Sequence, residues 1–89
     1  SDKADESLSE KKSRLQKELR EMEQIHGLRE RGKAWKDFNE RAEFRRDMNK
    51  KQHEIDDVER QMKAGDKDTI EDIKNSISNA KSILEDKFN

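Results

Sequence analysis

The chain has 89 residues, of which 48% are charged and only 27% apolar, and its net charge is −1. Because its charges are balanced and its apolar residues recur periodically, helical structure is a better prediction than disorder. The absence of cysteine excludes disulfides and thiolate metal sites. No apolar run approaches the roughly 20 residues that span a bilayer, and the polar N-terminus has no signal segment, so we expect a cytoplasmic module without membrane insertion.

The first predicted helix covers residues 8–26, after a polar stretch at 1–7 that we expect to be flexible. Its apolar residues share one face. They are Leu8, Leu15, Leu19, Met22 and Ile25. Gly27 follows His26 in a common helix-stop arrangement, and Gly32 comes soon after. Two interior glycines each cost a helix about 1 kcal/mol relative to alanine, so we expect a turn or a bend within residues 27–33.

Two further helices are predicted at residues 33–63 and 69–87, joined by a tight turn at Ala64-Gly65-Asp66-Lys67. Their apolar residues alternate in steps of three and four, as in a coiled-coil seam. In the first helix these residues are Phe44, Met48, Ile55, Val58 and Met62, with Lys51 in the one missing place; in the second they are Ile70, Ile73, Ile77, Ala80, Leu84 and Phe88. Asp68 and Glu71 have the spacing of a capping box, which would begin a helix after the turn.

The expected fold is all-α and forms one helical domain at residues 8–88. Its centre is an antiparallel helical hairpin of the coiled-coil type, formed by residues 44–88. If residues 27–33 make a true turn, the first helix folds back and completes a three-helix bundle, which we favour. If they make only a bend, the chain is an elongated hairpin with an overhanging arm. In either case Ile73→Ala or Ile77→Ala should cost about 2 to 4 kcal/mol if the seam is buried.

The sequence gives no pattern typical of an enzyme. His26 and His53 lie far apart and neither has a second ligand at metal-binding spacing. There is neither a glycine-rich phosphate loop nor a nucleophile with a base, and acidic residues are too numerous for any pair to stand out. We therefore predict no catalytic residues, no metal site and no cofactor.

A stretch of basic and aromatic residues, 29–46, contains the strongest candidates for partner contact. This stretch contains seven basic and four acidic residues, and this basic excess is too small to favour nucleic-acid binding. One interpretation is a solvated helix with internal ion pairs and Trp35 tucked into the end of the bundle. The other is a protein-binding patch, because tryptophan and arginine are frequent interface anchors. On that interpretation the contact residues are Arg31, Trp35 and Phe38.

Two blocks of sequence resemble a known family. Residues 7–23, with Ser9-Glu10-Lys11-Lys12 before Leu15-Gln16-Lys17-Glu18-Leu19, are similar to the start of the HR1 domains of the CIP4/TOCA group of membrane-remodelling adaptors. Gln61-Met62 and Gly65-Asp66, followed by the apolar residues of 70–84, resemble that group's interhelical loop and second helix. Here Lys63-Ala64 interrupts the loop motif, and the segment between the two blocks is longer than in the family.

The resemblance implies an antiparallel hairpin that binds a Rho-family small GTPase, Cdc42 in that group, and makes Met62, Gly65 and Asp66 candidate contact residues. The functional prediction is accordingly a non-enzymatic helical protein-interaction module, with a Rho-family GTPase as the suspected partner. The alternative is a coiled-coil oligomerisation or scaffolding segment of a larger protein, in which uncovered apolar residues pair between chains.

Overall fold

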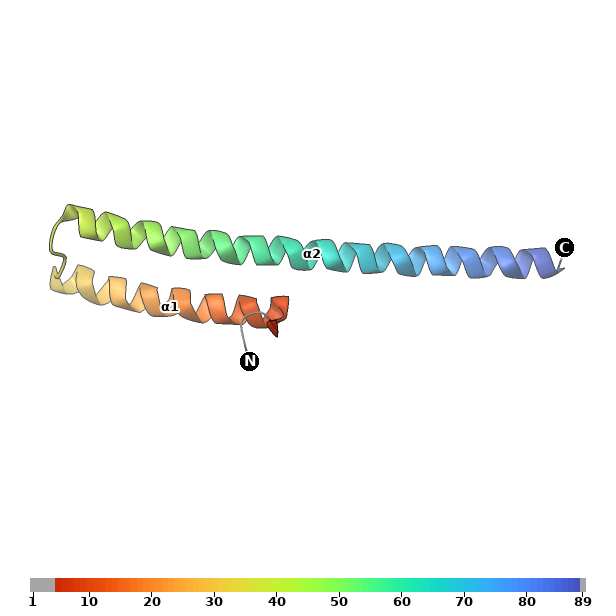
Figure 1. The fold of residues 1–89 in the computed structure, drawn as a ribbon, viewed down its shortest axis with the longest axis horizontal. Helices are drawn as coiled ribbons and strands as arrows, with labels where there is room; N and C mark the ends of the chain where they lie inside the picture. Colours follow the sequence, from red (N-terminus) through yellow and green to blue (C-terminus); the bar gives the residue numbers. More distant parts are fainter. Residues whose placement is uncertain (1–4, 89) are drawn as a thin grey trace.

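The computed structural model describes residues 5–88, which form two α-helices, α1 (Leu8–Gly32) and α2 (Phe38–Phe88). Residues 1–4, part of the stretch expected to be flexible, and residue 89 lie outside the described residues. The helices run antiparallel from a short connection at one end (Figure 1). Because α1 has 25 residues and α2 has 51, the C-terminal half of α2 extends beyond α1. The molecule is therefore elongated, measuring 79 × 26 × 17 Å.

Helix α1 is closed at both ends by local hydrogen bonds. At its start, the Ser7 hydroxyl accepts from the Glu10 amide and the Glu10 carboxylate accepts from the Ser7 amide, a complete capping box. At its end, Lys33 is left-handed, with φ 50°. The amides of Lys33 and Ala34 donate to the carbonyls of Glu30 and Arg29, the Schellman pattern that ends many helices. The expected break within residues 27–33 is thus confirmed at its last residue, while Gly27 lies inside the helix.

Helix α2 begins immediately after the connection because Asp37 caps it. The Asp37 Oδ1 accepts from the Glu40 amide at 2.8 Å, which satisfies one of the free amides of the first turn. Glu40 in turn accepts from the backbone amide of Lys36 at 2.7 Å and from Arg29 of α1 at 2.9 Å. The same side chain therefore holds the start of α2 and ties it to the end of α1.

The buried core lies between α1 and the first half of α2. Leu15, Ile55 and Val58 are 1–3% exposed, and the partly buried Leu19 and Met62 pack against them. Ion pairs on both sides of this seam set the antiparallel register. The early residues of α1 pair with the middle of α2, as Lys12–Glu59 and Glu18–Lys51, and the late residues of α1 pair with the start of α2, as Arg29–Glu40 and Glu30–Arg41. The apolar faces predicted within residues 8–25 and 44–62 do form the core. They pack against each other, whereas the face within 44–62 was expected to pack against residues 70–88.

The predicted three-helix bundle is wrong, because the described residues form two helices in an extended arrangement. The turn expected at 64–67 does not form, and the helices expected at 33–63 and 69–87 are one continuous helix. Gly65 adopts helical backbone geometry, and the Thr69 hydroxyl donates to its carbonyl at 2.9 Å within the helix. One glycine costs a helix only about 1 kcal/mol, which does not force a turn. The hairpin centred on residues 44–88 is replaced by one that turns at residues 33–37.

The part of α2 at residues 63–88, here named the C-terminal arm, is exposed along its whole length. It continues in line with the first half of α2 and has no second helix beside it among the described residues (Figure 1). The first half of α2 is already helical, so the arm extends an existing helix and does not bear the cost of nucleation. The overhang expected from a bend at 27–33 is N-terminal to the 44–88 hairpin, whereas the overhang in the structure is C-terminal and results from the absence of a turn at Gly65.

We expect Gly65→Ala to increase the helical content of the chain. A Cβ at this position meets no atom within 4 Å, and alanine is favoured over glycine inside a helix by about 1 kcal/mol. Circular dichroism and amide hydrogen exchange across residues 63–70 would measure the change. Ala64→Gly at the neighbouring position is the matched control and should have the opposite effect. A loss of helical signal in Gly65→Ala would indicate that the chain turns at this glycine instead.

Candidate partner-binding surface

Exposed apolar residues form a stripe along the C-terminal arm. It consists of Ile70, Ile73, Ile77, Ala80 and Leu84, and here is named the apolar stripe. Its isoleucines and leucine are 53–64% exposed, whereas Ile55 and Val58 of α2, which face α1, are 1–3% exposed. Its spacing is that of a coiled-coil seam, with Ile70, Ile77 and Leu84 in one core position and Ile73 and Ala80 in the other. The arm therefore has the residues of a helix–helix contact without a helix in contact.

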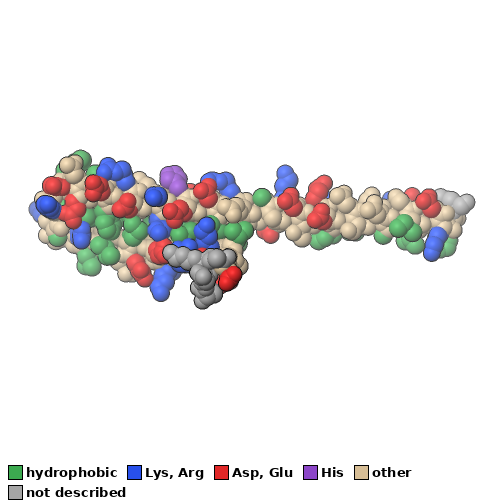
Figure 2. Space-filling model, viewed as in Figure 1, with side chains coloured by type: hydrophobic (Ala, Val, Ile, Leu, Met, Phe, Trp, Pro, Cys, Tyr) green, Lys and Arg blue, Asp and Glu red, His purple; other side chains and the backbone are tan. Residues whose placement is uncertain are grey.

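The apolar stripe lies on the side of α2 to which α1 is bound. Figure 2 shows hydrophobic side chains along the edge of the arm that faces the side on which α1 lies. Helical geometry agrees, since at about 100° per residue the centre of the stripe is turned by only about 45° from the residues that face α1. A helix seated on the stripe would therefore lie nearly in line with α1, beyond its N-terminal end.

The two edges of the apolar stripe differ in charge. Lys67, Lys74 and Lys81 follow one edge at intervals of seven residues, the position that flanks a coiled-coil seam. The other edge carries the uncharged Thr69, Ser76 and Ile83 at the same interval. Glu71 and Glu85 lie behind the lysines, further around the helix from the stripe. A partner that approaches the stripe thus meets a basic edge and a neutral one.

A chain of four charged side chains runs across the α1–α2 contact. Arg14 donates to Glu6 and Glu18, at 2.9 and 3.1 Å, and Lys51 of α2 donates to the other oxygen of Glu18 at 2.7 Å. The hydrogen bond from Lys51, followed by that from Arg14, holds the pKa of Glu18 below its ordinary value of 4.5. The two carboxylates, Glu6 first, raise the pKa of Arg14 above its usual range. This explains why a lysine occupies a seam position in α2: its ammonium group reaches a carboxylate of α1.

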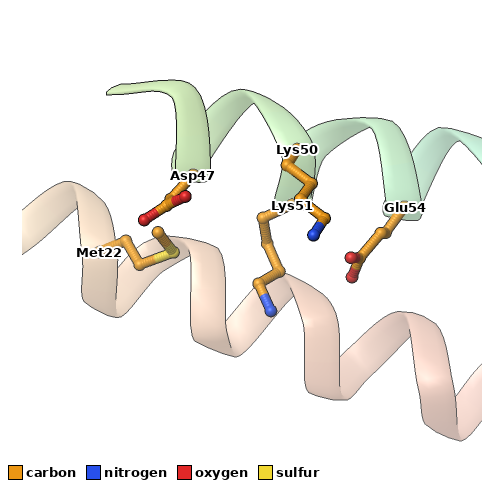
Figure 3. Close-up of a pocket in the computed structure, with 5 residues that line it drawn as sticks. All are labelled: Met22, Asp47, Lys50, Lys51 and Glu54. Atoms are coloured by element: carbon orange, nitrogen blue, oxygen red, sulfur yellow. The ribbon is translucent and has the colours of Figure 1, made fainter. Parts of the chain in front are cut away.

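The hollow beside Lys51 is lined by side chains of mixed charge. Figure 3 shows the Lys51 side chain extending from α2 toward α1, with Asp47, Lys50 and Glu54 of α2 and Met22 of α1 around it. The hollow is shallow, and no group of metal-ligating side chains is found among residues 5–88. Within that same range, neither α1 nor α2 contains an apolar stretch that could span a membrane.

Acidification should destabilise the hairpin, in part through Glu18. A carboxylate whose pKa is depressed in the folded state stabilises that state above its ordinary pKa and loses this effect as pH falls through the folded value. The urea midpoint should therefore fall as pH is lowered from about 7 to about 3, and the fall should be smaller in Glu18→Gln. Glu85→Gln, on the exposed arm, is the control and should keep the full dependence. Identical pH profiles for both variants would show that the Glu18 ion pairs do not stabilise the fold.

Trp35 lies in a cluster at the turn end of the hairpin. Its ring centroid is 5.4 Å from that of His26 in α1 and 5.4 Å from that of Phe44 in α2, and the guanidinium of Arg29 lies 5.2 Å above it. The indole Nε1 donates to Glu30 at 2.8 Å, and Arg41 of α2 also donates to this carboxylate. The bond from Arg41, then that from Trp35, lowers the pKa of Glu30. The half-buried Trp35 thus joins the connection to both helices.

The other two residues predicted with Trp35 have different positions. Phe38 is 77% exposed at the first residue of α2 and makes no ring contact within the described part of the chain. Arg31 is exposed in the last turn of α1, with its guanidinium beside Gly27. The structure therefore brings Trp35 together with His26, Arg29 and Phe44, and leaves Phe38 and Arg31 on the surface.

Met62, Gly65 and Asp66, predicted to form an interhelical loop, lie on consecutive turns of α2. Met62 is partly buried against the core, while Gly65 and Asp66 are exposed. Met62 and Asp66 line a hollow together with Lys12 of α1, Glu59 and Lys63. The hollow lies near the N-terminal end of α1, where the C-terminal arm begins. The structure thus places these two residues together, on the side of the molecule and not at its end.

Sequence reasoning did not identify the lysine edge as part of a surface. The intervals of seven between Lys67, Lys74 and Lys81 are the signal for it, but the predicted hairpin places the apolar stripe in a buried seam. Comparison of the chain with protein-family models, with curated proteins and with solved structures finds no match.

Proposed function

We propose that this chain is a non-enzymatic helical protein-interaction module, in which the hairpin presents the C-terminal arm as a docking surface for an amphipathic helix of another polypeptide. The observation that carries the proposal is the exposure of the apolar stripe in a helix that is otherwise well supported. Contiguous exposed apolar residues mark interaction sites, and a stripe with coiled-coil seam spacing is suited to bind a second amphipathic helix.

The two halves of α2 have separate roles in this proposal. The first half binds α1 through Ile55, Val58 and Met62, and the turn cluster and ion pairs hold that contact in place. The second half adds no packing to the hairpin, since its apolar residues are exposed. Selection for stability alone does not account for isoleucines and a leucine at seam spacing there, whereas a helix–helix contact does.

The test uses a synthetic peptide of four heptads with isoleucine and leucine in its seam and glutamine along both edges, labelled and held below its own self-association concentration. The full chain should bind it saturably in fluorescence anisotropy, with a gain in helical signal. Ile73→Asp/Ile77→Asp should weaken binding by at least about tenfold, which corresponds to about 1.4 kcal/mol.

The matched control is Asn75→Asp/Asn79→Asp, which adds the same two charges on the opposite face of the arm. This variant should bind the peptide as the unmodified chain does. All four positions are exposed, so the hairpin should keep its melting temperature in both variants. Absence of saturable binding, or equal weakening by both double variants, would contradict a docking role for the apolar stripe.

A Rho-family small GTPase is a second candidate partner, proposed from the resemblance to HR1 domains. It is supported by the position of Met62 and Asp66, which line one hollow with Lys12 of α1. Titration with GTP-loaded and GDP-loaded Rho-family proteins tests it. Binding of the GTP-loaded form alone, lost in Asp66→Lys, would support this candidate; absence of binding, or equal binding of both nucleotide states, would remove it.

Self-association through the apolar stripe is the alternative use of the same surface, as in an oligomerisation or scaffolding segment. It requires a second copy of the chain as the occupant of the arm. Sedimentation at several concentrations distinguishes the two: a monomer that does not depend on concentration removes self-association, and the peptide titration is unaffected by that result.

A further inference from the structure

The position that a partner helix must take on the apolar stripe restricts how a second copy could bind. The stripe faces the side of α2 that α1 covers in the hairpin (Figure 2). A second α2 running parallel to the first would continue past the arm into the space that α1 occupies, because α2 has 51 residues and the arm is only its last part. Parallel self-pairing is therefore blocked by α1. An antiparallel copy would fit, since its arm would lie in line with α1.

Charge opposes that antiparallel pairing. In an antiparallel coiled coil, the flanking edge of one helix faces the same edge of the other. Lys74 of one copy would lie against Lys81 of the other, with Lys67 at the end of the same row. Like charges along the flanking edges disfavour a pairing and select another partner. The chain therefore presents a seam that its own second copy does not complement.

We propose that the occupant of the C-terminal arm is an amphipathic helix of a different polypeptide, with an acidic edge beside its apolar seam that pairs with Lys67, Lys74 and Lys81. Residues 63–88 extend over about 39 Å at 1.5 Å per residue, so the partner helix covers about 26 residues when fully seated. Its end would lie against the N-terminal end of α1, where Leu8 is 38% exposed. This inference rests on the proposed function and adds the chemistry of the partner.

The test compares two peptides that share the isoleucine–leucine seam of the glutamine peptide but carry glutamate, or lysine, along both edges. Repulsion between like edges keeps each of them from pairing with itself. At low ionic strength the full chain should bind the glutamate peptide at least about tenfold more tightly than the lysine peptide. The triple variant Lys67→Glu/Lys74→Glu/Lys81→Glu should reverse this preference. All three lysines are exposed, so the hairpin itself should remain folded.

The outcomes separate this inference from the proposed function. Reversal of preference in the triple variant supports the acidic partner, and the preference should shrink as salt is added. Equal binding of both charged peptides, or preference for lysine, overturns the inference while leaving the stripe as a docking surface. A chain that dimerises at the titration concentrations also overturns it, because a second copy then fills the arm. If none of the three peptides binds, the proposed function fails as well.

Discussion

Leu15→Ala should lower the free energy of unfolding by about 2 to 4 kcal/mol. Leu15 is 1% exposed and packs between the helices against Ile55 and Val58, which together with it form the buried core. Removal of its branched end loses the burial of three carbon atoms and leaves a cavity that two helices can close only in part. Urea denaturation followed by circular dichroism measures the change.

Ile77→Ala is the matched control, because it removes the same number of carbon atoms from an exposed position. Ile77 is 64% exposed on the C-terminal arm, so its replacement should change stability by no more than about 0.5 kcal/mol. The sequence alone predicts the reverse for this residue, a loss of about 2 to 4 kcal/mol from a buried seam. If Leu15→Ala unfolds the chain outright, Ile55→Val should give a measurable loss of about 1 kcal/mol. Equal losses for Leu15→Ala and Ile77→Ala would indicate that α1 does not form the core with α2.

The small core explains why the hairpin depends on contacts at its edges. Three buried side chains contribute little stability in a domain of this size, and cores in this range seldom supply more than roughly 3 to 5 kcal/mol. The remaining restraint comes from the capping box at Ser7, the cap at Asp37 and the ion pairs between the helices. Exposed ion pairs each add little alone, but here several of them act on the same register.

The helical class and the apolar faces could be predicted from the sequence, whereas the pairing of those faces could not. Leu8 to Ile25, Phe44 to Met62 and Ile70 to Leu84 all have seam spacing, so the middle face can pair with either neighbour. The prediction chose the later face because Gly65 and the capping-box pattern at Asp68 and Glu71 indicated a turn. In the structure Asp68 lies inside α2, and the actual turn uses Lys33 and the cap at Asp37. Local turn signals are weak, and tertiary packing decided between them.

The candidate site could be predicted only in fragments. Trp35 was recognised as either a partner anchor or a residue tucked into the end of the fold, and its ring contacts with His26 and Phe44 agree with the second interpretation. The exposed surface on the arm was missed because exposure depends on which faces pair. Because the predicted hairpin buries Ile70 and Ile77 in its seam, it does not identify Lys67 and Lys74 as the edge of an exposed apolar surface. The partner-facing part of the chain therefore followed from the fold and not from any motif.

Trp35→Ala should lower the melting temperature by on the order of 10 °C, corresponding to a loss of about 2 kcal/mol in a chain of this length. The side chain is half-buried, so the expected loss is below the 3 to 5 kcal/mol typical of a fully buried tryptophan. Its removal eliminates the ring contacts of Trp35 with His26 of α1 and Phe44 of α2, one of the two rings beneath Arg29 and the hydrogen bond to Glu30. These contacts join both helices to the connection, so the loss should fall on the hairpin as a whole.

Phe38→Ala is the control, since Phe38 is an aromatic residue of the same segment that is 77% exposed. Its melting temperature should stay within about 2 °C of the unmodified chain. The Trp35→Ala variant should still bind the glutamine peptide at temperatures where the variant is folded, because the C-terminal arm lies at the opposite end of α2 from the turn (Figure 1). A variant that melts normally but no longer binds would instead make Trp35 a partner anchor. Such a result would place the docking surface at the turn and not on the arm, because loss of Trp35 would then affect binding without affecting the stability of the hairpin.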